Sequence, residues 1–230
     1  MKLLSKRFLA ENKKIKKKFL YDIKTGLQLV KSTASAKFNE TIEVHVSLNL
    51  NTKYLDNQLR TTVILPHGTG KQIRIATLVS PENFLEAQKA GSDIYGYDNL
   101  IDNIKKNIIN FDLLVTTPDM MPKLAKLGRI LGPKKLMPSP KMGTVTENIT
   151  TTIEEFKKGK IEYRADKNGL IHMIIGKANF SDEQLLENLY TFFNSLELKN
   201  PFLIKGTYIK KVTLCSTMGP GITIDYKIFY

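Results

Sequence analysis

The segment 67–71, with the sequence HGTGK, is the first place where residue types and spacing could do chemistry. Glycines followed by a lysine can cradle a phosphate, but the phosphate-loop motif needs a glycine at position 65 and a serine or threonine at position 72. Leu65 and Gln72 stand there instead. We therefore expect Gly68 and Gly70 to give backbone freedom where the chain crosses between domains, and not to bind a nucleotide.

The other side chains that could catalyse or bind a metal are His45, His67, His172 and Cys215. Their spacing matches no zinc pattern, and no acidic cluster accompanies the histidines along the sequence. A single cysteine excludes an internal disulfide bond and fits a reducing compartment. We expect Cys215 to be a small packed strand residue. Because there is also no G-x-S-x-G element, the sequence predicts a protein that is not an enzyme and has no catalytic residue, metal site or cofactor.

Two short segments, 36–41 (AKFNET) and 216–220 (STMGP), have residue types that contact folded RNA. The first combines a cation, an aromatic ring that we expect to be exposed, and a hydroxyl. The second joins two strands with hydroxyls, a methionine and a glycine that lets the backbone come close to a ligand. Such surfaces fit the wide, shallow minor groove of RNA and bond its 2′-hydroxyls. Taken singly, each segment is better explained as an ordinary strand cap or turn.

The charge of the chain favours a polyanionic partner. Lys and Arg number 35 against 22 Asp and Glu, which gives a net charge of +13 and a pI near 9.6. RNA, DNA and an anionic membrane surface all fit this charge. The sequence has no run of the roughly 20 apolar residues that span a bilayer. Lysines crowd the N-terminal segment where a signal peptide would be apolar, so we expect the chain to be made in the compartment where it works.

The two ends of the chain have the patterns of an antiparallel sheet covered by helices. In the basic N-terminal segment, near-helical spacing predicts a helix packed through Leu4, Phe8, Ile15 and Phe19. Alternating or strand-like runs lie at 41–50, at 160–178 with a hairpin turn at 166–169, at 208–215 and at 222–228. Ser181 and Gln184 predict a capping box for a helix that ends before Pro201.

The middle of the chain alternates strands with helices. Strand-like runs lie at 73–79, 93–95 and 112–116. Helix-like runs lie at 82–90, 99–110, 120–126 and, after a loop rich in Pro, Gly and Lys at 132–143, at 151–158. This alternation implies a parallel sheet between two layers of helices.

We therefore predict an α/β protein, in which an α+β domain made of residues 1–67 and 160–230 is interrupted by a three-layer α/β domain at 68–159. The inserted segment holds 13 basic and 10 acidic residues, which leaves 22 of the 35 basic and 12 of the 22 acidic residues to the flanking segments. The flanks are therefore the more basic part. We expect the surface that faces phosphates to lie mainly on the discontinuous domain.

Several segments resemble the ribosomal protein L-one family; they lie at 36–41, 65–71, 124–133, 136–141, 159–176 and 216–220. The resemblance covers essentially the whole chain, and 54–62 and 164–166 are most similar to the cyanobacterial and plastid branch. It implies a discontinuous domain with an inserted Rossmann-like domain. One departure is Lys135, which stands where the bacterial pattern usually has glycine.

The resemblance also implies a function. A protein of this family is a structural constituent of the large ribosomal subunit that binds an arm of the large ribosomal RNA. Together they form the mobile stalk beside the exit site, which assists release of deacylated tRNA. Bacterial relatives also bind their own messenger RNA and repress its translation, so a repressor using the same surface is the alternative. We expect a plastid (chloroplast) ribosome and an organelle-encoded chain, with the bacterial cytoplasm as the alternative, and neither a membrane partner nor an obligate homo-oligomer.

The same resemblance implies which residues contact RNA. The principal contacts form two groups from distant parts of the chain, namely Lys37, Phe38 and Thr41, and Ser216, Thr217, Met218 and Gly219. Arg164 and His172, in the hairpin region, are expected as additional contacts. The loop of the inserted domain carries lysines that either touch RNA or tRNA or are simply solvated, namely Lys134, Lys135 and Lys141.

Overall fold

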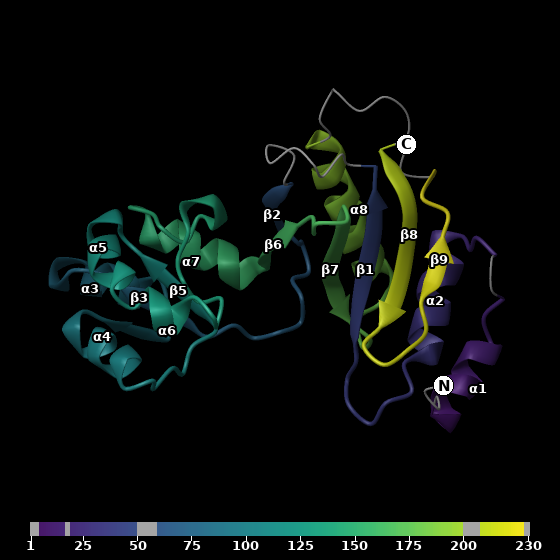
Figure 1. Cartoon of the computed structure of the whole chain (residues 1–230), viewed down its shortest axis with the longest axis horizontal. Coiled ribbons are helices and arrows are strands. Elements are labelled where there is room, and N and C mark those ends of the chain that lie inside the picture. The colour runs from purple at the N-terminus through teal and green to yellow at the C-terminus, as the bar shows by residue number, and fades with distance from the viewer. Residues whose placement is uncertain (1–4, 17–18, 50–58, 200–207, 228–230) are drawn as a thin grey trace. The chain divides into compact units, whose positions relative to one another are not determined.

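The structure is a computed structural model that describes residues 5–16, 19–49, 59–199 and 208–227. Contacts within the chain divide it into two compact units, which are labelled by element in Figure 1. Unit 1 consists of Met1–Gly70 and Ile161–Tyr230, and unit 2 of Lys71–Lys160. None of the described helices is long and apolar enough to cross a membrane.

Unit 1 is built on an antiparallel sheet in the order β7-β1-β8-β9. The strands are β1 (Thr41–Leu48), β7 (Leu170–Lys177), β8 (Ile209–Ser216) and β9 (Ile222–Ile224). Every second residue of β1, from Ile42 to Leu48, is buried, while the residues between them are half-buried. The predicted alternation of this strand is therefore confirmed, although its last predicted residue, Leu50, lies outside the described residues.

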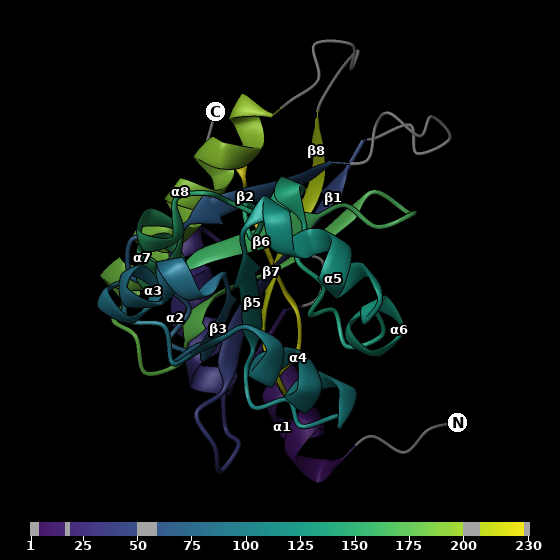
Figure 2. The same cartoon turned by 90° about the vertical axis from the view of Figure 1, so that its left-hand side faces the viewer.

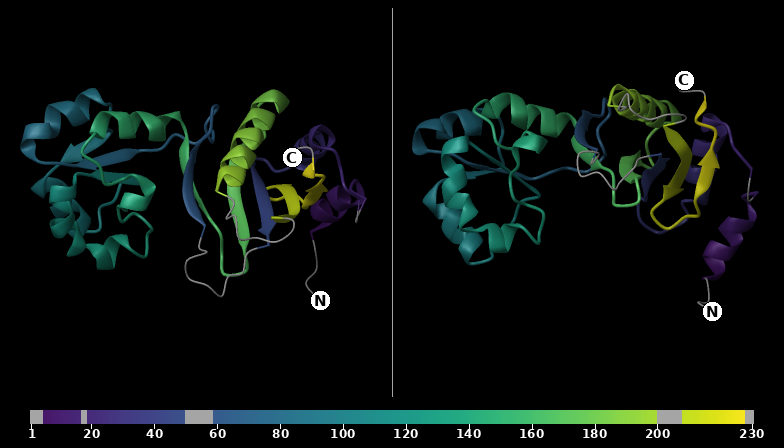
Figure 3. Two further views of the ribbon diagram at one scale, coloured as in Figure 1. Left: turned by 90° about the horizontal axis from the view of Figure 1, so that it is seen from above. Right: turned by 45° about the horizontal axis from the view of Figure 1, so that its top comes forward.

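Two helices, α2 (Ile23–Thr33) and α8 (Asp182–Leu198), pack against the apolar face of this sheet (Figure 3). The predicted capping box of α8 is confirmed, because Gln184 N–H donates to the Ser181 hydroxyl and Ser181 N–H donates to the Gln184 side chain. Helix α8 buries five large side chains in one core with the sheet, namely Leu185, Leu189, Phe192, Phe193 and Leu196.

The prediction for the N-terminal segment is wrong in two respects. Helix α1 (Lys6–Lys13) is short and buries no side chain, and Ile15, which is buried, lies beyond its end. Successive lysines repel one another at helical spacing, which disfavours a longer helix. Helix α2 was not predicted, although Leu27 and Val30 on its inner face are fully buried. Leu4 lies outside the described residues.

The predicted hairpin at 160–178 forms only at its turn. Asp166 accepts hydrogen bonds from the N–H groups of Asn168 and Leu170, and Gly169 has a φ of +74°. Beyond an isolated bridge the strands separate, because β6 (Lys160–Arg164) pairs with β2 (Arg60–Ile64), while β7 pairs with β1. The strand β2 was not predicted.

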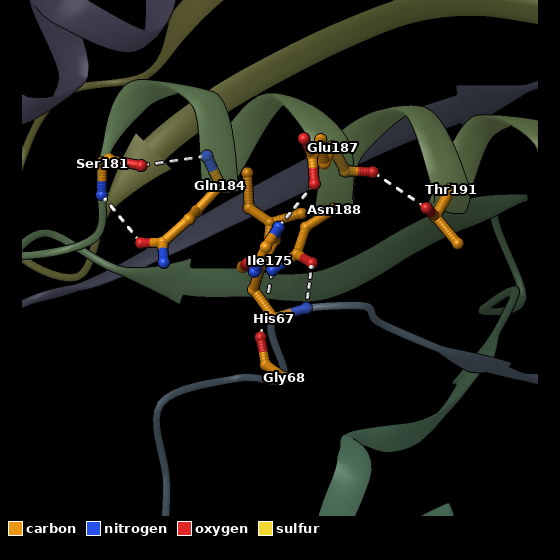
Figure 4. Close-up of polar contacts among 8 residues, drawn as sticks. All are labelled: His67, Gly68, Ile175, Ser181, Gln184, Glu187, Asn188 and Thr191. Atoms are coloured by element: carbon orange, nitrogen blue, oxygen red, sulfur yellow. Dashed lines mark hydrogen bonds and ion pairs between the residues drawn. The ribbon is translucent and has the colours of Figure 1, made fainter.

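The segment that leaves β2 is fixed to α8 by a buried amide. Asn188, which is fully buried, accepts a hydrogen bond from His67 N–H (3.1 Å). It donates to the carbonyl oxygens of Gly68 (3.0 Å) and Ile175 (2.8 Å), as Figure 4 shows. One side chain therefore ties together the crossing segment, the helix and strand β7, all within unit 1.

Unit 2 contains the predicted parallel sheet. Its strands are β3 (Ile75–Leu78), β4 (Ile94–Gly96) and β5 (Leu113–Thr116), in the order β4-β3-β5. The central strand β3 is buried over its whole length, as expected for a strand covered on both faces.

Helices cover both faces of that sheet, as Figure 2 shows around β3 and β5. One face packs against α3 (Phe84–Lys89) and α7 (Ile149–Lys158). The other packs against α4 (Asp98–Lys105), α5 (Met121–Ala125) and α6 (Gly128–Leu131). Short 3-10 turns lie at η2 (Pro81–Asn83), η3 (Pro118–Met120) and η4 (Pro140–Met142). The α/β fold class, with an antiparallel and a parallel part, is thus confirmed.

Candidate RNA-binding surface

The two segments predicted to contact RNA, 36–41 and 216–220, meet at one end of the unit 1 sheet. Strands β1 and β8 pair up to Ile42 and Ser216, and beyond them Thr217 N–H donates to the Thr41 carbonyl oxygen at 3.0 Å. Thr41 N–H donates to the Thr217 hydroxyl oxygen, also at 3.0 Å. In Figure 1 the segment that enters β1 and the turn between β8 and β9 lie side by side at the lower end of this sheet. Residues 176 positions apart in sequence are therefore direct neighbours.

Glu40 joins these segments from below the surface, and its role was not predicted. Its carboxylate is 1% exposed and accepts hydrogen bonds from Ala36 N–H (2.8 Å) and Met218 N–H (3.0 Å). Burial alone would raise the pKa of Glu40. The two N–H groups, with smaller contributions from the Ser216 hydroxyl and the charge of Arg7, hold it below its ordinary value. The buried charge therefore fixes the backbone of residues 36–41 and 216–219, which together are called the junction.

Several of the predicted contact residues are exposed at this junction. Phe38 is 55% exposed and Met218 is 50% exposed, and Lys37 and Thr217 are exposed beside them. Single exposed apolar side chains also occur elsewhere among the described residues, for example Leu85 at 70%, so exposure alone does not identify a binding surface. What distinguishes Phe38 and Met218 is that their two segments are joined by hydrogen bonds to one buried carboxylate. The junction therefore presents an apolar surface of two side chains next to a cation and a hydroxyl.

Two small residues shape the turn that carries Met218. A Cβ atom added at Gly219 would lie 2.4 Å from the Ser216 hydroxyl oxygen, so only glycine fits without a shift. Ser216 itself is 1% exposed, because it pairs with Ile42, whose side chain faces the core. The prediction that the Ser216 hydroxyl contacts RNA directly is corrected to a supporting role beneath the turn.

A further cation, Lys177, lies at the junction and was not predicted. It pairs with Thr41 across β1 and β7, and its ammonium group donates to the Thr41 hydroxyl at 2.8 Å. The alternation of β7 shows which face Lys177 occupies, but only the register between the strands shows that it lies beside Thr41.

Arg164 lies at the other end of strand β7. Its neighbour Ala165 forms an isolated bridge with Ile171, near the start of β7. Lys177, at the opposite end of β7, pairs with Thr41 at the junction. The six steps along the strand from Ile171 to Lys177 span about 20 Å at 3.3 Å per residue. Arg164 is exposed, but the structure does not bring it together with the junction. His172 is also exposed and lies on β7, one residue beyond Ile171 towards the junction.

The outer face of the sheet brings together four polar side chains, namely Glu43, His45, His172 and Cys215. The His45 Nδ1 atom lies 2.7 Å from His172 Nδ1, and its Nε2 atom lies 3.0 Å from Cys215 Sγ. Burial lowers the pKa of His45, and the neighbouring His172 lowers it further. Burial raises the pKa of the Cys215 thiol to about 11, with a contribution from nearby Glu43. The sequence analysis expected no metal-ligand spacing and no acidic cluster around these histidines, but strand pairing brings one carboxylate and one thiol close to His45.

The lysines of the second-domain loop are all exposed. Lys134 donates a hydrogen bond from its ammonium group to the Asn107 side chain at 2.7 Å, and Lys141 lies in η4. Lys135 has a φ of +59°, in the left-handed region that glycine adopts at least cost. The backbone at this position therefore has the conformation that a glycine would favour.

Comparison with known proteins gives a full-length match. The sequence model of the family described as "Ribosomal protein L1p/L10e family" matches residues 30–220. The chain is 52% identical over 229 residues to "Large ribosomal subunit protein uL1c" of Trieres chinensis, and 52% identical over 229 residues to the protein of the same name from Phaeodactylum tricornutum. Both alignments cover 100% of each chain. It is 51% identical over 225 residues to "Large ribosomal subunit protein uL1" of Prochlorococcus marinus (strain AS9601), covering 98% of this chain and 95% of that protein.

Proposed function

We propose a function from the premise that this chain belongs to the Ribosomal protein L1p/L10e family. It is a constituent of the large ribosomal subunit, and it is not an enzyme. Its task is to hold an arm of the large ribosomal RNA through unit 1, as part of a mobile stalk beside the exit site that assists release of deacylated tRNA. In this proposal unit 1 is the discontinuous RNA-binding domain, and unit 2 is the inserted domain.

The observation that carries the proposal is the junction between residues 36–41 and 216–219. Two exposed apolar side chains, Phe38 and Met218, lie on backbone segments that Glu40 binds together. A rigid surface loses little conformational entropy when it binds, so its apolar contacts are retained as affinity. The junction is therefore organised before the RNA arrives.

Each group at the junction has a definite use against RNA. Lys37 and Lys177 attract phosphates, and the hydroxyls of Thr41 and Thr217 reach 2′-hydroxyls in a minor groove. The Phe38 ring and the Met218 thioether pack on a sugar or an unstacked base. Gly219 leaves the backbone open to close approach. Arg164 and His172 extend the contact along the sheet, so the RNA arm covers more than the junction alone.

The lysines of unit 2 are the proposed secondary contacts. Lys134, Lys135 and Lys141 are exposed on one loop and are suited to phosphates of RNA or of exit-site tRNA. Each would contribute a salt-dependent attraction without sequence preference.

The direct test measures binding of purified variants to a fragment of the large ribosomal RNA arm. Phe38→Ala, Thr217→Ala and Met218→Asp should each weaken binding by about ten- to hundred-fold, corresponding to about 1–3 kcal/mol per lost contact. Phe38→Ala is the cleanest of the three, because an exposed ring can be removed with little loss of folding stability. Circular dichroism should show unchanged secondary structure in each variant.

Matched controls lie in unit 2. Leu85→Ala removes an apolar side chain that is 70% exposed, and Lys89→Ala removes an exposed cation. Thr151→Ala removes an exposed threonine hydroxyl. Loss of affinity at these positions equal to the loss at the junction would refute the site assignment.

Sedimentation distinguishes the ribosomal role from the regulatory one. A structural role predicts that the protein travels with large subunits, and that Phe38→Ala releases it. A repressor that binds its own messenger RNA through the same surface predicts a ribosome-free pool instead. We assign the chain to a plastid ribosome, with a bacterial one as the alternative, and the genomic location of its gene separates the two.

A further inference from the structure

The outer face of the unit 1 sheet carries a group of three potential metal ligands. Glu43 and Cys215 face each other across β1 and β8, and His45 follows Glu43 on the same side of β1. Figure 1 shows these two strands side by side, with β7 on the other flank of β1. Among the residues that the structure describes, this is the only such group of histidine, cysteine and carboxylate ligands.

The ligand atoms already have nearly the spacing that a metal requires. The His45 Nε2 atom lies 3.0 Å from Cys215 Sγ and 3.9 Å from Glu43 Oε2, and all three atoms lie within 4.8 Å of one another. Around a tetrahedral zinc ion with bonds of about 2.0–2.3 Å, neighbouring ligand atoms are about 3.3–3.6 Å apart. The two distances from His45 bracket that value, so small side-chain rotations would complete the geometry.

His172 holds the His45 ring in the orientation that such a site needs. A hydrogen bond between the two Nδ1 atoms, at 2.7 Å, requires one donor and one acceptor. When His45 Nδ1 carries the proton, its Nε2 atom has a free lone pair directed towards the cysteine and the glutamate. Histidines that bind metals commonly donate their other N–H group to a nearby acceptor in this way.

We propose that Glu43, His45 and Cys215 bind a divalent transition metal ion, of which Zn²⁺ is the best match. Sulfur, imidazole and carboxylate ligands together favour a metal of borderline softness over Mg²⁺ or Ca²⁺. Three protein ligands leave the fourth position to water. On binding, the Cys215 thiol releases its proton to solvent and the thiolate bonds to the metal, while His45 binds as neutral imidazole and His172 acts as a positioning residue.

Spectroscopy of the cobalt-substituted protein tests the site directly. The chain has one cysteine, so a thiolate-to-Co²⁺ charge-transfer band can come only from Cys215. Titration of the reduced full-length protein with Co²⁺ should produce that band, which should saturate at one metal per chain and disappear when Zn²⁺ is added. Absence of the band would overturn the proposal.

Variants separate the site from adventitious binding. Cys215→Ser should abolish the band, and Glu43→Gln and His45→Gln should each weaken Co²⁺ binding at least tenfold. His172→Ala should weaken it about ten- to hundred-fold while the band keeps its position, because this residue acts through His45. His67→Gln is the control, since His67 pairs with Glu187 away from any thiol.

Circular dichroism should show that all of these variants are folded. Metal binding that is unaffected by Glu43→Gln and His45→Gln, or that falls equally in His67→Gln, would contradict the ligand assignment. The measurement involves no RNA, so its failure leaves the proposed ribosomal function untouched.

Discussion

Replacement of Glu40 by alanine tests whether a buried carboxylate fixes the junction. The variant removes the acceptor of both the Ala36 and Met218 N–H groups. Hydrogen bonds to an ionised group contribute about 1.5–3 kcal/mol each. Water that enters the vacated space restores part of this, so we expect the free energy of unfolding to fall by about 3 kcal/mol. Urea denaturation followed by circular dichroism measures it.

The same variant should also weaken binding to the ribosomal RNA arm, because the two segments are no longer held in register. Glu197→Ala, at an exposed position of α8, is the matched control and should change stability by no more than about 0.5 kcal/mol. If the two variants lose equal stability and Glu40→Ala binds RNA normally, the carboxylate does not organise the junction.

The effect of Glu40 should also depend on pH. Its hydrogen bonds keep the pKa in the folded protein below the ordinary value of 4.5. The stabilisation is therefore fully present above pH 4.5 and is lost as the pH falls through the lower, folded-state pKa. The difference in stability between the natural chain and Glu40→Gln should shrink below pH 4.5. A constant difference across that range would contradict the assignment of an ionised carboxylate.

Two more substitutions test the backbone at the crossing segment and in the loop of unit 2. Asn188→Ala removes three hydrogen bonds and should lower the free energy of unfolding by about 3 kcal/mol, at about 1 kcal/mol each, whereas Asn194→Ala, exposed on the same helix, should change it little in the same urea titration. Lys135→Gly should raise the free energy of unfolding, measured in the same urea titration, by about 1 kcal/mol. The reason is that glycine adopts the left-handed conformation at lower cost than lysine. A decrease as large as that of Lys134→Gly, at an ordinary φ, would contradict this reason.

The sequence predicts most accurately the features that depend on nearby residues. The capping box of α8 needs only Ser181 and Gln184, three positions apart, and the alternation of β1 needs only its own eight residues. The strands and helices of unit 2 also follow from local periodicity. Prediction failed for β6, which leaves its expected partner β7 and pairs with β2, because a long-range pairing decides between these alternatives. It also failed locally at the N-terminus, where α2 was missed and α1 is shorter than predicted.

The candidate site was only partly predictable for the same reason. Phe38 and Met218 are identifiable from the motifs that contain them, but the register of β1 against β8 decides which residues become their neighbours. That register buries Ser216, and it brings Cys215 to Glu43 from 172 positions away in the sequence. The pattern within one strand shows which face each side chain takes, but it does not say which residue of which other strand lies opposite. Glu40, Lys177 and the proposed metal-binding group therefore could not be identified before the strands were paired.

A buried carboxylate beneath a surface that is proposed to bind RNA phosphates would at first sight oppose binding. Glu40, however, is 1% exposed and accepts hydrogen bonds from two N–H groups, so little of its negative field reaches solvent on the side where RNA is proposed to bind. The general attraction comes from the excess of cations on the flanking segments, which act over a Debye length of roughly 8 Å at physiological salt. That attraction does not distinguish one RNA from another. Discrimination then depends on the fixed shape of the junction, and a buried ion held by backbone groups is well suited to fix a shape without adding charge to the surface.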